Sequence, residues 1–239
     1  MLDLIKLEST KVKRTSMGKI IVALTLLPPV LIMIQYLCIK DDNKDFFTTL
    51  TGSNVIITMC LCTSLIIFSS YIFSREYQDK TYIYLFISPK SKRSIFVAKY
   101  LTVLVEMLIS CGGSYGITLL MNVIFGDVDS EIIEKFLLAW LCGVSLLFLL
   151  MPFIVAINIW KKNFISSMLI ALVLLIFTFP FMFKENFYIF PQLVPMAVVN
   201  NLLKVEDKID INYGLVYGIM IGVFAIFTVL SLRVFEKKE

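Results

Sequence analysis

Six long apolar runs divide the chain, and each is long enough to cross the hydrocarbon core of a bilayer as a helix. Crossing about 30 Å requires roughly 20 predominantly apolar residues. The six expected spans cover about 20–39, 53–74, 95–121, 136–159, 164–183 and 213–232. No run alternates as a barrel strand does, and backbone groups left open in lipid are costly. The pattern predicts an all-α, polytopic membrane protein with six transmembrane helices in a single transmembrane domain, residues 1–239.

Composition narrows the function classes further. Hydrophobic residues make up 59% of the 239 residues and charged residues only 17%, against about 45–50% and 25% in soluble domains. The chain has no histidine, which removes Ser-His-Asp and Cys-His catalysis and His-ligated zinc. Its five cysteines lie in apolar runs without metal-ligand spacing, so buried thiols are expected. We therefore expect no catalytic residues and no metal site.

The polar segments between the spans differ in charge, which predicts the orientation. One set holds 16 Lys and Arg residues and the other holds six, while the acidic residues lean the opposite way, six against 11. The basic set comprises the amino terminus, 75–99, 160–163 and the carboxyl tail; the other comprises 40–52, 122–135 and 184–212. By the positive-inside rule the basic set is cytoplasmic, and both termini with it. Anionic membrane lipid explains these basic residues, so no nucleic-acid partner is expected.

The amino-terminal residues 1–18 have the pattern of an interfacial helix. Leu2, Ile5 and Val12 share one helical stripe, and basic side chains occupy much of the remainder. Such a helix lies on the inner leaflet, with its apolar side toward lipid. The alternative, a basic leader that only sets the topology, stays open.

The segment 75–94 between the second and third spans is the richest in polar detail. It begins with the charged residues Arg75, Glu76, Asp79 and Lys80, continues through an aromatic middle, and ends near Pro89. Proline disfavours helix at the preceding residue and separates this piece from the third span. A short helix at the cytoplasmic surface, where a partner protein docks, is one interpretation. An ordinary basic inter-helix loop is the other.

These residues resemble the ABC type-2 permeases, the membrane subunits of many bacterial exporters. That family commonly carries E-x-x-x-G-T after the second span, then L-x-x-P, a basic residue and a lysine leading into the third span. The matching positions are Glu76, Thr81, Leu85/Phe86, Ser88-Pro89, Arg93 and Lys99, with Lys80 in place of the glycine. The amphipathic start, the six spans and the length extend the resemblance over the whole chain. In size it looks most like the small permeases of bacitracin and lantibiotic self-protection systems.

The resemblance implies a transport subunit, not an enzyme, in the bacterial cell membrane. It implies a separate ABC ATPase in two copies, which carries ATP and Mg and docks through Glu76, Asp79, Lys80 and Thr81, and a second permease copy or paralogue. The chain itself lacks the phosphate loop G-x-x-x-x-G-K-[ST], since its only Gly-Lys pair, Gly18-Lys19, is followed by Ile20. The implied cargo is amphipathic or lipid-associated: a peptide antibiotic such as bacitracin or a lantibiotic, or a lipid.

Glu106 is the only ionisable residue deep inside an expected span. A charge at this depth costs several kcal/mol unless it is paired, protonated or hydrated. Lys99 lies two turns earlier on the same face, and its side chain, bent down along the helix, could partly approach Glu106. Two interpretations remain: a polar point in a substrate path or gate, or an interhelical hydrogen bond that fixes packing.

Glycines repeat at four-residue intervals in two spans. Gly214, Gly218 and Gly222 lie on the last span, and Gly112 with Gly116 on the third. Small residues at this spacing let helices approach closely, so packing is favoured over ligand binding. The spacing leaves open whether the partner helix belongs to the same subunit.

The expected external loop 184–212 has an apolar half, residues 187–203, which is too short to span the bilayer. It either dips into the outer leaflet or shields the helix ends as a lid. Two rival functions also remain: a non-transporting immunity or scaffold protein, and an ion-coupled carrier. A carrier should hold several buried titratable groups, so one glutamate and no histidine argue against it.

Overall fold

The computed structural model describes most of the chain and is helical almost throughout that part. The described residues are 7–8, 10–12, 15–38, 46–78, 91–125, 130–184, 187–203 and 211–237. Within these ranges no strand occurs. The all-α prediction is therefore confirmed.

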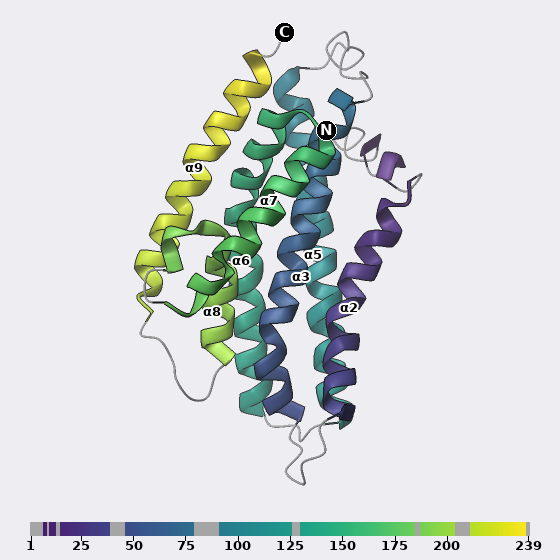
Figure 1. Cartoon of the computed structure of the whole chain (residues 1–239), viewed down its shortest axis with the longest axis vertical. Coiled ribbons are helices and arrows are strands. Elements are labelled where there is room, and N and C mark those ends of the chain that lie inside the picture. Colours follow the sequence, from purple (N-terminus) through teal and green to yellow (C-terminus); the bar gives the residue numbers. More distant parts are fainter. Residues whose placement is uncertain are drawn as a thin grey trace.

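Six long helices form one bundle and run alternately up and down (Figure 1). They are α2 (Met17–Cys38), α3 (Phe46–Gln78), α5 (Lys92–Phe125), α6 (Ser130–Lys161), α7 (Phe164–Thr178) and α9 (Tyr213–Lys237). Each begins or contains a stretch long and apolar enough to cross a membrane, which confirms the six predicted spans. α3 and α5 have 33 and 34 residues, about 50 Å at 1.5 Å per residue. They therefore project beyond a hydrocarbon core of about 30 Å.

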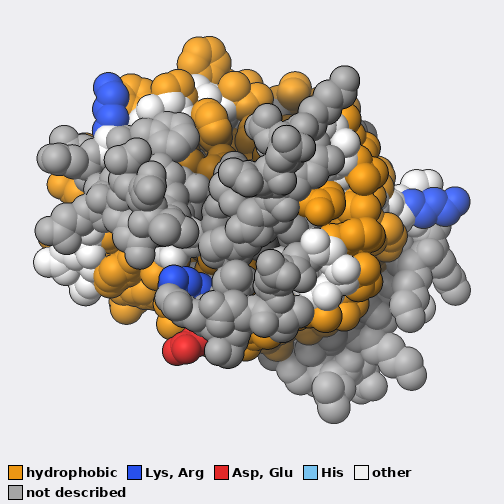
Figure 2. All heavy atoms as spheres, turned by 90° about the horizontal axis from the view of Figure 1, so that it is seen from below, with side chains coloured by type: hydrophobic (Ala, Val, Ile, Leu, Met, Phe, Trp, Pro, Cys, Tyr) orange, Lys and Arg blue, Asp and Glu red, His pale blue; other side chains and the backbone are white. Residues whose placement is uncertain are grey.

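Helix α3 lies at the centre of the bundle. It packs against α2, α5, α6, α7 and α8, whereas α9 packs mainly on α6. α2 and α9 lie on opposite flanks (Figure 1), and large apolar side chains such as Leu37, Ile176 and Ile226 are exposed. Viewed from below, the described side chains on the visible face are mostly hydrophobic (Figure 2). Such a surface is stable against lipid but not against water.

Buried polar side chains join three of the helices. Asn158 of α6 accepts a hydrogen bond from Ser70 Oγ of α3 at 2.8 Å and donates one to Ser69 Oγ at 3.1 Å. Ser74 of α3 donates to the Asn158 carbonyl at 3.2 Å and lies 3.3 Å from Ser167 Oγ of α7. All five side chains are buried. Because each has a partner, the network ties α3, α6 and α7 in one register.

The chain after α7 folds back into the bundle. It forms the 3-10 helices η1 (Phe179–Phe183), η2 (Phe187–Ile189) and η3 (Pro191–Leu193), then α8 (Val194–Leu203). Nearly every residue of α8 is buried, and the helix packs on α6 and α3. Gln192 Nε2 donates to Thr178 Oγ1 at 3.1 Å, which links η3 to the end of α7. Residues 187–203 were expected to dip into the outer leaflet or to shield the helix ends, whereas α8 packs inside the helix bundle.

The amino-terminal end of α2 and the carboxyl-terminal end of α9 lie at the same end of the bundle (Figure 1). Six crossings require this. The fold does not distinguish one side of a membrane from the other, so the cytoplasmic placement of both ends stays a prediction from the charge distribution.

Candidate functional site

A buried ion pair joins the last turns of α3 to the beginning of α5. Lys99 Nζ lies 2.6 Å from Glu76 Oε2 and donates a hydrogen bond to the Ile72 carbonyl at 2.8 Å. The Lys99 side chain is only 1% exposed. An ammonium group so far from solvent requires a carboxylate and a further acceptor, and α3 supplies both.

The amino-terminal segment completes this group of charges. Lys11 Nζ donates to Glu76 Oε1 and to Glu8 Oε1, both at 2.8 Å, and Glu8 Oε2 lies 3.9 Å from Lys99 Nζ. We call Glu8, Lys11, Glu76 and Lys99 the ionic cluster. Two carboxylates and two ammonium groups make it neutral overall, which suits its partial burial.

Lys11 is the member of the ionic cluster that reaches furthest toward solvent. Burial acts to lower its pKa, but attraction to Glu76 and hydrogen bonds to Glu76 and Glu8 outweigh it, so the pKa is raised above the ordinary value. Because the folded-state pKa exceeds the unfolded one, the stabilisation from Lys11 is fully present near neutral pH. It is lost only as strongly alkaline pH passes the raised pKa.

Glu76, one of the four residues expected to contact an ATPase, is a member of the ionic cluster. Glu76 lies within the last turn of α3, and its carboxylate is paired internally. Asp79, Lys80 and Thr81, the other residues expected to contact an ATPase, lie outside the described residues. Docking through these four residues stays a prediction.

The described part of the amino-terminal segment packs on protein. Residues 7–8 and 10–12 are helical, and both Val12 and Glu8 are buried. Leu2 and Ile5 lie outside the described residues. The helical stripe of Leu2, Ile5 and Val12 did not predict that Glu8 would be buried. The i,i+3 pair of Glu8 and Lys11 is visible in the sequence, but its meeting with α3 and α5 is not.

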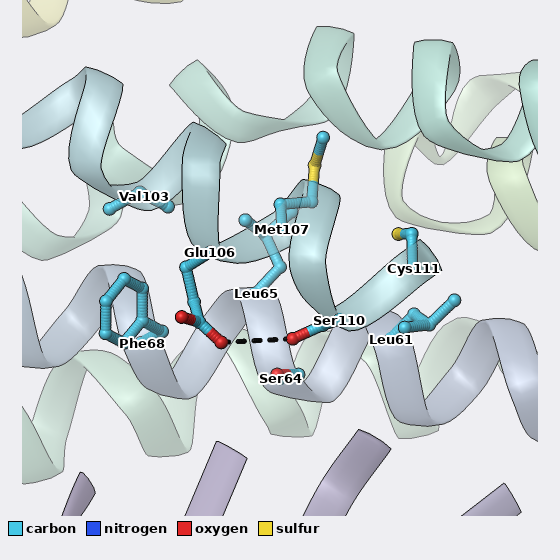
Figure 3. Close-up of a pocket in the computed structure, with 9 residues that line it drawn as sticks. All are labelled: Leu61, Ser64, Leu65, Phe68, Val103, Glu106, Met107, Ser110 and Cys111. Atoms are coloured by element: carbon cyan, nitrogen blue, oxygen red, sulfur yellow. Dashed lines mark hydrogen bonds between the residues drawn. The ribbon is translucent and has the colours of Figure 1, made fainter. Parts of the chain in front are cut away.

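Glu106 lies farther along α5 and lines a pocket between α5 and α3 (Figure 3). Ser110 Oγ, one turn later, donates to Glu106 Oε1 at 3.1 Å. The expectation that Lys99 approaches Glu106 is wrong, because the Lys99 ammonium turns to α3 and pairs with Glu76. The carboxylate of Glu106 is thus separate from the ionic cluster.

The pocket around Glu106 is largely apolar. Its enclosed space is small, about 10 Å³, which is room for about one water-sized group, and the pocket is partly open to the outside of the bundle. The lining residues are Leu61, Ser64, Leu65 and Phe68 of α3 and Val103, Glu106, Met107, Ser110 and Cys111 of α5. None of these is basic. The Glu106 carboxylate can accept a hydrogen bond from a small group that enters the pocket, or it can pair with a small cation there.

The structure describes the glycines singled out in the sequence without placing them in tight helix contacts. A Cβ built at Gly112, Gly116, Gly218 or Gly222 meets no described atom within 4 Å. At Gly214 it meets Asn212 Oδ1 at 3.4 Å, an ordinary contact. Their role in packing therefore stays a prediction, and it requires a neighbour beyond the described helices.

Two glycines that the spacing argument missed do lie in close contacts. A Cβ at Gly113 would lie 3.0 Å from Thr25 Cγ2 of α2, and one at Gly143 would lie 3.2 Å from Val199 Cγ2 of α8. Neither belongs to a four-residue glycine repeat, so no such periodicity marks them. Only the packing of α2 on α5 and of α8 on α6 reveals them.

The described residues contain no group of three acidic, cysteine or histidine side chains able to hold a metal ion. Cys60, Cys62, Cys111 and Cys142 are free thiols.

Comparison with known proteins gives the class of protein. Residues 4–178 match the family described as ABC-2 family transporter protein, so the chain belongs to the ABC-2 transporter family. Together with the six apolar helices, this makes it a multi-pass membrane protein of the bacterial cell membrane.

A curated relative is similar over part of its length. It is the bacitracin transport permease protein BCRB of Bacillus licheniformis, with 25% identity over 132 residues. The alignment covers 54% of this chain and 64% of that protein, so the chain spans less than two thirds of the relative it matches.

Proposed function

We propose that this chain is the membrane subunit of an ATP-driven exporter that moves an amphipathic or lipid-associated substrate out of or across the membrane. The cargo we propose is a peptide antibiotic such as bacitracin or a lantibiotic, or a lipid. The observation that carries the proposal is the family match over residues 4–178, which includes the ionic cluster and the Glu106 pocket. The name of the partly aligned relative favours bacitracin among the candidates.

The family implies an ABC ATPase as partner, and we propose two copies of it, each binding ATP and Mg. A second permease copy or paralogue would complete the membrane part. We propose that the ATPase contacts Asp79, Lys80 and Thr81, with Glu76 at the edge of the contact. The Glu76–Lys99 pair supports this, because it joins the two helices that flank this segment. A force that the ATPase applies to this segment would therefore act on α3 and α5 together.

The test begins with recovery of the partner. A tagged chain, purified from its native host in mild detergent, should bring down an ABC ATPase, and Asp79→Ala or Lys80→Ala should reduce its yield severalfold. Lys135→Ala, at the far end of the bundle on α6, is the matched control and should leave recovery unchanged. Clean recovery of the chain without any ATPase would contradict the proposal.

The second step tests transport. Co-expression with the recovered ATPase in a bacitracin-sensitive strain should raise the inhibitory bacitracin concentration severalfold. Replacement of the phosphate-loop lysine of the ATPase should abolish this gain, because the energy then cannot be supplied. Resistance that persists without ATP hydrolysis would instead identify a non-transporting immunity protein.

A further inference from the structure

Glu106 is an acidic group without a basic partner among the described residues. Its carboxylate accepts a hydrogen bond from Ser110 Oγ at 3.1 Å. Lys99, two turns earlier on α5, is occupied by Glu76 and the Ile72 carbonyl. A carboxylate inside a membrane-spanning helix is costly unless a cation, a proton or water compensates it. In the described structure, the Glu106 carboxylate receives one neutral hydrogen-bond donor, the Ser110 hydroxyl.

The surroundings of Glu106 suit an alkylammonium group. In Figure 3 the carboxylate points toward α3, with Phe68 on one side and Leu65 and Ser110 on the other. Ser64 contributes a hydroxyl to the same pocket. An ammonium group is about the size of a water molecule and can pair with a carboxylate, donate to a hydroxyl and lie over an aromatic ring, while its attached hydrocarbon would extend through the open side of the pocket. The pocket offers each of these partners.

A row of polar residues continues from Glu106 along α5. Thr102, Glu106, Ser110, Ser114, Thr118 and Asn122 recur at every fourth position. All except Glu106 are buried. Thr102 and Thr118 donate to carbonyls of their own helix, but Ser114 Oγ and Asn122 Oδ1 have no hydrogen-bond partner among the described residues.

Helix α3 adds a further polar side chain to this row. The antiparallel register that places Ile72 beside Lys99 and Leu61 in one pocket with Cys111 puts Asn54 level with Ser114 and Thr118. Asn54 is fully buried, and neither atom of its amide has a described partner. A buried polar group without a partner is costly. Since each step of four residues turns about 40° round the helix axis, these groups wind away from the Glu106 side of α5, and of this row Glu106 and Ser110 line the pocket.

We propose that the Glu106 pocket binds the protonated amine of an amphipathic molecule, with Ser110 and Ser64 beside it. The inference rests on the proposed export function and narrows its substrate class. Two sources can supply the shared chemistry, an ammonium group on an apolar body. One is an amine-bearing peptide substrate, and the other is the headgroup of an ethanolamine lipid.

Binding of two matched small probes tests the proposal on the purified full chain in maltoside detergent. Hexylammonium and N-hexylacetamide share the alkyl chain, but only the first carries a positive charge. Titration calorimetry should show at least tenfold tighter binding of hexylammonium. Glu106→Gln should remove that preference. Equal affinity of the two probes for the wild type would overturn the proposal, as would an undiminished preference in Glu106→Gln.

Two further variants separate the site from general effects. Glu106→Asp keeps the negative charge and should keep the preference for hexylammonium, which holds the test open if Glu106→Gln is poorly folded. Glu134→Gln removes an exposed carboxylate from α6 and should change nothing. Loss of the preference in Glu134→Gln, with Glu106→Gln unaffected, would place the cation elsewhere and overturn the proposal.

Competition identifies the source of the amine. Displacement of hexylammonium by bacitracin points to the peptide, and displacement by dihexanoyl phosphatidylethanolamine, but not by its phosphatidylglycerol counterpart, points to lipid. No ATPase or ATP is present in these titrations. A chain that binds amines but confers no resistance would therefore contradict the export function alone, and resistance without amine preference would contradict the pocket alone.

Discussion

At the scale of single residues, the ionic cluster shows how two helix ends can be joined through buried charge. Lys99 is almost fully enclosed and relies on Glu76 and the Ile72 carbonyl, while its distance to Glu8 is 3.9 Å. Glu76 has a second cation in Lys11. Removal of Lys99 therefore leaves Glu76 with a cation, whereas removal of Glu76 leaves Lys99 without a close carboxylate.

This difference predicts unequal effects of two substitutions. Glu76→Gln leaves the buried Lys99 without a close carboxylate and should destabilise the protein by about 3–5 kcal/mol. Lys99→Met leaves Glu76 paired with Lys11 and should cost less. Thermal unfolding of the purified protein, followed by its tryptophan fluorescence, measures both.

The double substitution provides the control. Glu76→Gln with Lys99→Met leaves Glu8 paired with Lys11, which is neutral, so the double variant should be more stable than Glu76→Gln alone. Equal melting temperatures for the two single variants, or a double variant worse than either, would contradict the assigned pairing.

At the scale of helices, hydrophobic length determines which segments cross, and close contacts determine how they pack. α2 approaches α5 where Gly113 faces Thr25, and α8 approaches α6 at Gly143. The regular Gly112 and Gly116 spacing instead faces open space in the described structure. A repeat in the sequence identifies a small-residue surface, but the rotation of the helix decides what meets it.

The contact between α2 and α5 predicts contrasting effects of neighbouring substitutions. Gly113→Leu would force a side chain into Thr25 and should destabilise the protein by about 1–3 kcal/mol, as overpacking does. Gly112→Leu introduces the same side chain one residue away, where no described atom lies within 4 Å, and should be tolerated. The melting temperatures of the two variants are the measurement.

A second substitution tests whether the contact with Thr25 causes the difference between Gly113→Leu and Gly112→Leu. Adding Thr25→Ala to Gly113→Leu removes the methyl group that the new side chain meets and should restore part of the lost stability. If Gly112→Leu proves as harmful as Gly113→Leu, the contact between α2 and α5 is not the cause.

At the scale of the whole molecule, six apolar helices form a bundle with many large apolar side chains exposed, and the described side chains on the face seen from below are mostly hydrophobic (Figure 2). α3, the most buried span, carries the partners of the ionic cluster, the Glu106 pocket and the Asn158 network. One helix therefore links the end of the bundle to its interior. A displacement of α3 would alter all three groups together.

Orientation yields a prediction for the entire molecule. Alkaline phosphatase fused after Lys162, between α6 and α7, should be inactive because the charge distribution places this connection inside the cell. A fusion after Asn212, before α9, should be active. The reverse pattern would leave the helix bundle unchanged but would contradict the positive-inside assignment.

The sequence by itself determined the number of spans, the helical class and the family resemblance. The reason is that a membrane requires long apolar stretches and satisfied backbone groups, which are local properties of the chain. Glu106 was also identifiable, since an ionisable residue inside a span is rare. Its neighbour Ser110 follows from the i,i+4 spacing on one helix face.

Only the tertiary structure decided which distant residues meet. Lys99 was expected beside Glu106 because both share a face of α5, yet it pairs with Glu76 because α3 offers both a carboxylate and a carbonyl. Burial of Glu8, the insertion of α8 and the tight contact at Gly113 likewise depend on neighbours far away in the chain. Local pattern specifies a helix and its faces, whereas the partner of each face follows from packing the whole bundle.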